Sequence, residues 1–292
     1  MQYKTNHTFH IGAQHLSLGK PCQDYAQSGT LNESTAYAIV SDGCSSGGET
    51  DIGARIVALA TKRALEENAH LPNITVERIN VVRDAYIETY RRTLGLEHRD
   101  LLATSLWALI TPNGVLAHIT GDGVLAMQYE LDTLVYEFSW ADNKPYYPAY
   151  RLGNIDPGFV IAHQDNPLPL TASVTYAKLV SMSGLRDGAF TEYSVEVGMT
   201  GVTIKKQLPE QDDELGRLIG ISLFSDGLTQ VDTYETVAAA QELTSFKSTQ
   251  GDFLVRRMNK FLQESRKVGR GPIDDIACAS ILFSTDKQTE GG

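Results

Sequence analysis

The chain opens its first half with two apolar patterns of helical spacing. In residues 49–69, apolar side chains such as Ile52 and Ile56 recur on one face, with acids early and bases later. A second amphipathic helix is expected to begin near Thr75, which can cap a first turn, and to end near Gly95. Both patterns predict helices that pack one face against a core.

Strand patterns follow in the middle of the chain and return near its end. TSLWALI and VLAHIT are separated by Asn113-Gly114, a pair that tolerates the positive φ of tight hairpins. With VLAMQYE and LVYEF, they predict an antiparallel meander over residues 104–138. A further strand is expected around IGISLFSDG, then helices near residues 233–245 and 251–266, and a last strand over residues 276–283.

The order of these elements favours an α+β fold. Clustered strands with helices at both ends suggest helices packed on antiparallel sheets, whereas a parallel sheet requires regular alternation of strand and helix. Residues 139–217 are rich in Pro, Gly, Asn and Asp and look like an insertion. Its tyrosines, Tyr146, Tyr147 and Tyr150, either line a groove or pack the insertion's own core, and packing is the favoured alternative.

Composition narrows the class of protein. The 292 residues are 42% hydrophobic and 21% charged, as in ordinary globular proteins, and the net charge of -11 argues against nucleic acid or an anionic membrane as partner. No apolar stretch is long enough for a membrane helix, and no secretory signal is evident. The three cysteines lack a zinc or disulfide spacing, so a cytoplasmic location is expected.

Acidic residues stand at the ends of several predicted strands. Asp42, Asp122 and Asp226 each follow an apolar run and precede a glycine, and Asp274 and Asp275 open the last run. One Asp-Gly pair is usually only a turn. Several acids gathered at sheet ends would repel one another unless a cation neutralised them, and Mg²⁺ and Mn²⁺ prefer oxygen ligands. The pattern therefore favours a divalent metal site.

Five motifs in order resemble the PP2C-type (PPM) metal-dependent serine/threonine protein phosphatases, in a bacterial branch: QDY, VSDGCSSGGE, TSLWALI with ITGDG, FSDGLTQ and DDIACASI. The resemblance covers almost the whole chain. It implies a four-layer α-β-β-α sandwich with two central antiparallel sheets flanked by helices. Residues 1–292 would form a single domain, with a flap-like insertion at residues 141–215.

The resemblance also implies a reaction and its ligands. In such enzymes, a water that bridges two Mn²⁺ or Mg²⁺ ions attacks phosphoserine or phosphothreonine, so no side chain serves as nucleophile. Asp42 would bridge both ions and Gly43 would add its carbonyl. Asp226 and Asp274 would bind the first ion, and Asp24 the second, directly or through waters. Asp122 either helps hold a weak third ion, because Gln230 stands where many members have Asp, or is a turn acid.

The chain departs from the family at the phosphate and proton sites. Where many members have Arg before the first acid, it offers Lys20, with His15 as a second candidate for phosphate binding or as a structural histidine. Cys44 replaces a proposed general acid and is expected only to pack. At the last strand, the family pattern places Asp274 at the metal and Asp275 where Asn is usual, so a neutral side chain at 275 should be tolerated.

The sequence thus predicts a Mn²⁺/Mg²⁺-dependent phosphatase that acts on phosphorylated proteins, with a cognate kinase as counterpart. Two alternatives stay open. A catalytically weak domain could bind a phosphoprotein without turning it over, as the missing Arg and His would suggest. A small-molecule phosphomonoester hydrolase would use the same acids.

Overall fold

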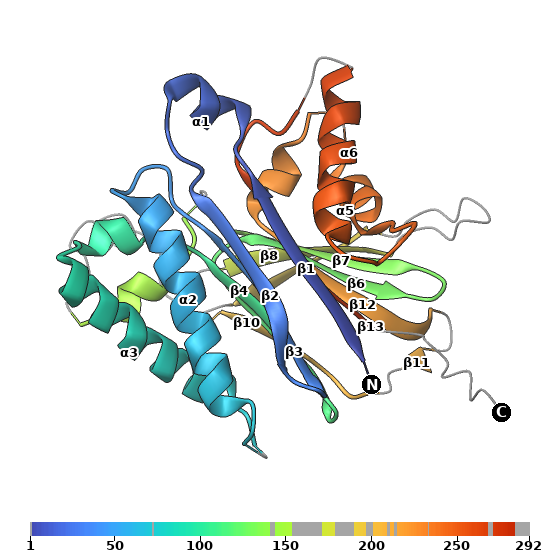
Figure 1. Ribbon diagram of the computed structural model, residues 1–292, viewed down its shortest axis with the longest axis horizontal. Coiled ribbons are helices and arrows are strands. Elements are labelled where there is room, and N and C mark those ends of the chain that lie inside the picture. The colour runs from blue at the N-terminus through green and yellow to red at the C-terminus, as the bar shows by residue number, and fades with distance from the viewer. Residues whose placement is uncertain are drawn as a thin grey trace.

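The computed structural model describes residues 2–71, 73–140, 144–153, 171–178, 190–196, 201–208, 211–212, 215–232, 234–267 and 271–283. Its strands form two antiparallel sheets (Figure 1). The smaller sheet has the order β10 (Val202–Lys206), β5 (Gly114–Thr120), β4 (Ser105–Thr111), β3 (Thr35–Asp42) and β2 (Asp24–Asn32). The larger has the order β1 (Tyr3–His10), β13 (Ile276–Phe283), β12 (Gly216–Phe224), β6 (Gly123–Tyr129), β7 (Thr133–Trp140), β8 (Thr171–Lys178) and β9 (Phe190–Glu196), and β11 (Gln211–Asp212) pairs with β12.

Helices cover the outer faces of both sheets. In Figure 1, α2 (Thr50–Asn68) and α3 (Val76–Leu94) lie side by side on one side of the molecule, and α5 (Thr236–Thr244) and α6 (Phe253–Lys267) lie on the other. The connections between these helices and strands contain the short α1 (Ala13–Leu18) and the 3₁₀ turns η1 (His98–Leu101), η3 (Pro148–Arg151) and η4 (Asp226–Gln230). This arrangement confirms the predicted four-layer sandwich.

Alternating side chains explain why the central strands are apolar on both faces. In β3, Ala38 and Val40 belong to the core between the sheets, whereas Tyr37 and Ile39 pack with residues of α2 and α3. Successive side chains of a strand point to opposite faces, so a strand covered on both faces has no polar alternation. The continuous run before Asp42 therefore reflects burial on two sides.

The predicted four-strand meander is wrong. Its strands are present, but β4 and β5 lie in the smaller sheet and β6 and β7 in the larger one. Gly121 and Gly123, with φ of 100° and 136°, turn the chain from one sheet to the other, a backbone conformation that side chains rarely adopt. A Cβ on Gly121 would also lie 2.6 Å from Cγ2 of Thr104. Asp122 thus stands on a crossover between the two sheets.

Part of the predicted insertion extends the sheets. β8 and β9 continue the larger sheet beyond β7, and β10 forms an edge of the smaller one. Much of residues 141–215 lies outside the described residues, so the flap-like insertion and the single-domain organisation stay predictions. Tyr146, Tyr147 and Tyr150 are buried, as the packing alternative expects, but they pack with residues of α2 and η1 and not in a core of the insertion's own.

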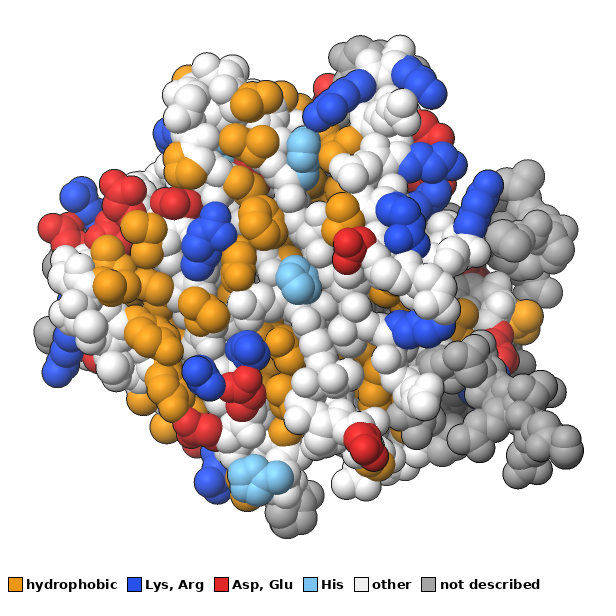
Figure 2. Space-filling model, in the orientation of Figure 1, with side chains coloured by type: hydrophobic (Ala, Val, Ile, Leu, Met, Phe, Trp, Pro, Cys, Tyr) orange, Lys and Arg blue, Asp and Glu red, His pale blue; other side chains and the backbone are white. Residues whose placement is uncertain are grey.

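The outer surface carries its charge unevenly. Figure 2 shows Lys and Arg side chains gathered over α6, where Arg256, Lys260, Arg266 and Lys267 are exposed. The apolar side chains of the same helix, among them Phe261, pack under it. Among the described residues, no helix is both long and apolar enough to cross a membrane.

Candidate metal centre

Antiparallel pairing brings the predicted acids to one end of the sandwich. Asp24 begins β2 and Asp42 ends β3, and the two residues are directly opposite each other in the strand register. Residues 223–224 of β12 pair with residues 278–279 of β13, so the end of β12 lies beside the start of β13. Asp226 follows the one and Asp274 precedes the other. Asp42 and Asp226 act on each other through charge and a side-chain hydrogen bond, so the two pairs, one from each sheet, lie at the same end of the sandwich.

Asp122 joins this group from the crossover between β5 and β6. The next residues of β6 pair with the end of β12, which places the crossover near Asp226. We call Asp24, Asp42, Asp122, Asp226 and Asp274 the acid cluster. Among the described residues, none of its members forms an ion pair with Lys or Arg, so its negative charges are not neutralised by side chains.

Burial and mutual repulsion disfavour the ionised forms of these acids. Burial, and then the charge of Asp226, raise the pKa of Asp122 to about 7. Burial also raises the pKa of Asp24 and of Asp42 well above the usual range, although hydrogen bonds from Ser225 and Asp42 act in the opposite direction on Asp24. The pKa of Asp226 is raised by burial and by the charge of Asp274. Acids arranged in this way favour a bound cation.

One oxygen of Asp24 is buried without a partner. The residue is 2% exposed, and its Oδ2 atom has no hydrogen bond. An unpaired buried oxygen costs free energy unless an ion or water satisfies it. Because the whole acid cluster offers oxygen ligands, which hard divalent cations prefer, the donor set fits Mg²⁺ or Mn²⁺.

Backbone contacts fix the loop that carries Asp42 and Gly43. The backbone N–H of Asp42 donates a hydrogen bond to Thr104 Oγ1 at 2.9 Å. The backbone N–H of Thr104 donates one to the Asp42 carbonyl at 2.8 Å. Gly43 N donates to Gln23 O at 3.1 Å, and a Cβ on Gly43 would lie only 2.5 Å from Thr50 O. The glycine is therefore required for this close packing, whether or not its carbonyl binds a metal.

Asp274 and Asp226 are connected by Gln230. The Gln230 amide Nε2 donates to Asp226 Oδ2 and to Asp274 Oδ2, at 3.3 Å each. The backbone N–H of Asp275 donates to Asp274 Oδ1 at 2.8 Å. Gln230, which departs from the family pattern, thus holds two members of the acid cluster together with a neutral donor.

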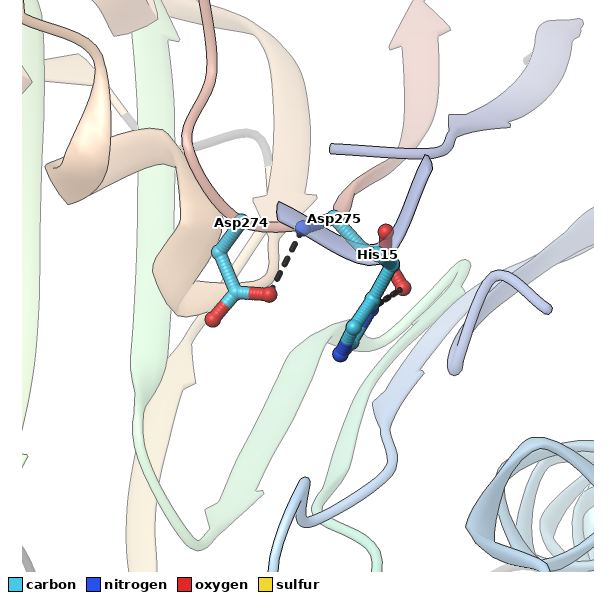
Figure 3. A group of neighbouring side chains, drawn as sticks. All are labelled: His15, Asp274 and Asp275. Atoms are coloured by element: carbon cyan, nitrogen blue, oxygen red, sulfur yellow. Dashed lines mark hydrogen bonds and ion pairs between the residues drawn. The ribbon is translucent and has the colours of Figure 1, made fainter. Parts of the chain in front are cut away.

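His15 contacts Asp275, the residue that follows Asp274 in the loop before β13. Its Nδ1 is 2.8 Å from Asp275 Oδ2, and both side chains are buried. Figure 3 shows the imidazole and the Asp274 carboxylate beside each other, and potential ligand atoms of His15, Asp274 and Asp275 lie within 4.8 Å of one another. One imidazole nitrogen is therefore occupied by Asp275, as expected of the structural alternative for His15; its role in phosphate binding stays a prediction.

The other departures from the family lie nearer the surface. Lys20 is exposed, and its ammonium group forms no ion pair with a described residue, so it is available to an anion. Its backbone N–H is fixed by His15 O at 3.0 Å. Cys44 is partly buried, with its Sγ 3.1 Å from Ser46 Oγ.

Sequence reasoning missed the hydrogen bonds that hold the acids. Those of Thr104, Gln23 and Gln230 depend on which segments come together in the fold, and no periodicity marks them. The Asp275–His15 pair spans 260 positions of the chain, which spacing arguments cannot detect. The adjacent acids Asp274 and Asp275 were the one available signal, since two like charges at a strand start call for different partners.

Comparisons with known proteins agree with this fold. Residues 11–153 match the sequence model of the family described as protein phosphatase 2C. The serine/threonine phosphatase Stp1 from Staphylococcus aureus is 13% identical, with a TM-score of 0.54 over 97% of this chain and 96% of that one. A serine/threonine phosphatase from S. agalactiae is 14% identical, with a TM-score of 0.50 over 97% of this chain and 100% of that one.

The PP2C phosphatase domain of SpoIIE from Bacillus subtilis is also similar in structure. It is 10% identical, with a TM-score of 0.51 over 98% of this chain and 65% of that one. No curated protein sequence matches the chain. These findings confirm the resemblance to the bacterial protein phosphatase 2C type that the motifs indicated, and identities this low bear on the fold alone.

Proposed function

We propose that this protein is a metal-dependent serine/threonine protein phosphatase whose acid cluster binds two Mn²⁺ or Mg²⁺ ions. The observation that carries the proposal is the gathering of the acid cluster, without a basic partner among the described residues, around a buried and unpaired oxygen of Asp24. The family match of residues 11–153 supports it.

Each member of the cluster has a proposed position. The charges of both Asp24 and Asp226 act on Asp42, which supports it as the ligand that would contact both ions. Asp226 and Asp274, already joined through Gln230, would hold one ion, and Asp24 the other. Asp122 would contribute to a weak third site. When bound, the ions would supply an activated water and positive charge for the phosphoryl oxygens.

The chain's own residues would orient the substrate. Lys20 is an exposed cation beside the short helix α1, at the end of the sandwich where the acids gather, and would attract the phosphate as a point charge. His15 is the second candidate for this role through the nitrogen that Asp275 does not occupy. A phosphorylated protein is the proposed substrate, with a kinase as its counterpart.

The test measures hydrolysis of p-nitrophenyl phosphate and of a phosphothreonine peptide with Mn²⁺, with Mg²⁺ and after chelation. We expect activity on both substrates that disappears on chelation and returns with metal. Asp42→Asn should lower kcat/KM at least about 100-fold at saturating Mn²⁺, because it removes the charge of a ligand shared by two ions.

Glu33→Gln is the matched control. It removes one negative charge from the exposed turn at the opposite end of the β2–β3 hairpin, so activity should be unchanged. Full activity in the presence of chelator would refute the metal dependence. Phosphopeptide binding without turnover would favour the binding-domain alternative, and hydrolysis of p-nitrophenyl phosphate without any phosphopeptide turnover would favour a small-molecule hydrolase.

A further inference from the structure

Asp275 has a buried carboxylate whose two oxygens are both occupied. Oδ1 accepts from Gly12 N at 2.7 Å, and Oδ2 accepts from Gln23 N at 2.6 Å and lies 2.8 Å from His15 Nδ1. The residue is 2% exposed. Each oxygen already accepts a backbone N–H from another segment, so Asp275 is arranged to hold these segments together.

The partners of Asp275 come from the opposite end of the chain. Gly12 is the residue before α1, His15 lies within α1, and Gln23 immediately precedes Asp24. The loop before β13 makes two more contacts with the start of α1, in which residues 13 and 14 donate their N–H groups to the carbonyls of residues 272 and 273. Asp275 is therefore the charged centre of a clamp between residues 12–23 and the start of β13.

An ionised carboxylate can only accept hydrogen bonds, so all three partners must donate. The two backbone groups always do. His15 must then carry its hydrogen on Nδ1, and Nε2 is left as the nitrogen that can face another group. Figure 3 shows the contact between the imidazole and Asp275, with the Asp274 side chain alongside. Asp275 thus fixes both the position of the ring and the nitrogen it presents.

Gln23 connects Asp275 to the acid cluster through further hydrogen bonds. While its N–H is held by Asp275, its carbonyl accepts from Gly43 N at 3.1 Å, and its side-chain Nε2 donates to Thr50 Oγ1 at 2.7 Å. Thr50 Oγ1 in turn donates to Cys44 O at 3.0 Å. One residue therefore connects Asp275 to the loop that carries Asp42, and it is the direct neighbour of Asp24.

On the other side, Asp275 is bonded to Asp274. Its backbone N–H donates to Asp274 Oδ1 at 2.8 Å, so a shift of residue 275 moves the carboxylate that is proposed to bind metal. Gly12 packs directly on this peptide, since a Cβ on Gly12 would lie 2.2 Å from the Asp274 carbonyl carbon. The backbones of the two segments are therefore in direct contact at this point.

We propose that Asp275 is a positioning residue that sets the geometry of the metal centre by clamping the segment of Asp24 to the segment of Asp274. It acts through Gln23, His15 and its own backbone, and contacts neither metal nor substrate. The inference rests on the proposed function, because it concerns the same acid cluster. It assigns different roles to the two adjacent acids.

This role changes the expectation for Asp275→Asn. From the sequence alone, Asn should be tolerated at 275. In the structure, the amide NH₂ would face the buried N–H of Gly12 in one orientation and the buried N–H of Gln23 in the other. In either orientation, two N–H donors face each other. The side chain at 275 then loses one of the two hydrogen bonds that it accepts from the backbone.

The experiment is a calorimetric titration with Mn²⁺ on the full chain, at a temperature where circular dichroism shows each variant folded. We expect Asp275→Asn to weaken Mn²⁺ binding about 10- to 100-fold, as loss of a group that orients a ligand does. His15→Ala, which removes one of three donors, should weaken it less, and Asp274→Asn should weaken it most. Glu33→Gln should bind as the wild type does.

The outcomes separate the two proposals. A wild-type chain that binds no Mn²⁺ would overturn the proposed function. Wild-type binding with unchanged affinity in folded Asp275→Asn would overturn the positioning role alone, because a residue that only stabilises the fold leaves affinity intact. Should Asp275→Asn fail to fold, unchanged affinity in His15→Ala overturns it instead. Loss of binding in Asp275→Asn with retention in Asp274→Asn would make Asp275 the ligand.

Discussion

Single residues in this protein are constrained by backbone approach as much as by charge. Asp226 and Asp42 are each followed by a glycine, and the family resemblance implied that the Gly43 carbonyl binds a metal. In the structure, both glycines are required by the close approach of another backbone segment. A Cβ on Gly227 would lie 1.7 Å from the carbonyl oxygen of Asp275, so the turn after Asp226 packs directly on the loop before β13.

Gly227→Ala should therefore destabilise the fold. Because the atom it meets belongs to the backbone, the loop must move, and we expect a loss of at least about 2 kcal/mol in the free energy of unfolding. Gly271→Ala is the control, since no atom lies within 4 Å of its Cβ position, and its effect should stay within about 1 kcal/mol. Urea unfolding of both variants measures the difference, and equal stabilities would contradict the close approach.

At the residue scale, the sequence indicated positions that are marked by recurring acidic residues. It could not indicate roles that depend on a single hydrogen bond between distant segments. Asp42, Asp122, Asp226 and Asp274 were named because they stand at the ends of apolar runs, a pattern visible in one sequence, whereas Asp24 was named through the family resemblance alone; their binding of metal stays a prediction. His15 could be read as a phosphate ligand or as a structural histidine. Only the position of Asp275 shows which nitrogen is occupied, and that position depends on the packing of distant segments.

Among the elements, α2, α3, α5 and α6 were predicted closely because their signals are local, whereas the short α1 was not predicted. α3 runs from Val76 to Leu94, with Thr75 as its N-cap and Gly95 in the left-handed conformation after its last turn. The assignment of strands to sheets was not predicted correctly. Strand pairing is decided by long-range contacts, and the glycines at the crossover look like any other turn.

The N-cap of α3 gives a prediction at this scale. Thr75 Oγ1 accepts from Arg78 N at 3.2 Å, so Thr75→Ala should lower the free energy of unfolding by about 1 kcal/mol. Thr89→Ala, in the same helix and exposed, is the control. Its hydroxyl only donates back to Ala85 O, and its loss should be close to neutral. Chemical denaturation compares the two, and a Thr75→Ala variant as stable as Thr89→Ala would show that the cap contributes nothing.

For the whole molecule, the uncompensated acids predict an unusual dependence of stability on pH. The pKa of Asp122 is raised to about 7 in the folded state by burial and by Asp226, above its ordinary value of 3.8. The metal-free fold binds this proton more tightly than the unfolded chain does. The resulting stabilisation is complete below the ordinary pKa and is lost as the pH rises toward and through about 7.

Chelator-treated protein should therefore unfold more easily at about pH 8 than at about pH 5.5. Asp122→Asn should reduce this slope, which separates the effect from that of histidines titrating in the same range. Added Mn²⁺ should raise the melting temperature more at the higher pH, because the cation then offsets more repulsion. Thermal melts at both pH values provide the measurement, and a metal-free protein that gains stability toward pH 8 would contradict the raised pKa.

The place of β13 has a consequence for the biosynthesis of the protein. This strand lies between β1 and β12, and the loop before it brings both Asp274 and Asp275. On the ribosome, every other strand that the structure describes emerges before β13, so until then β1 and β12 each have an unpaired edge and the acid cluster lacks Asp274. On the proposed function, a chain interrupted before β13 would therefore be inactive, and its unpaired strand edges would make it prone to aggregate.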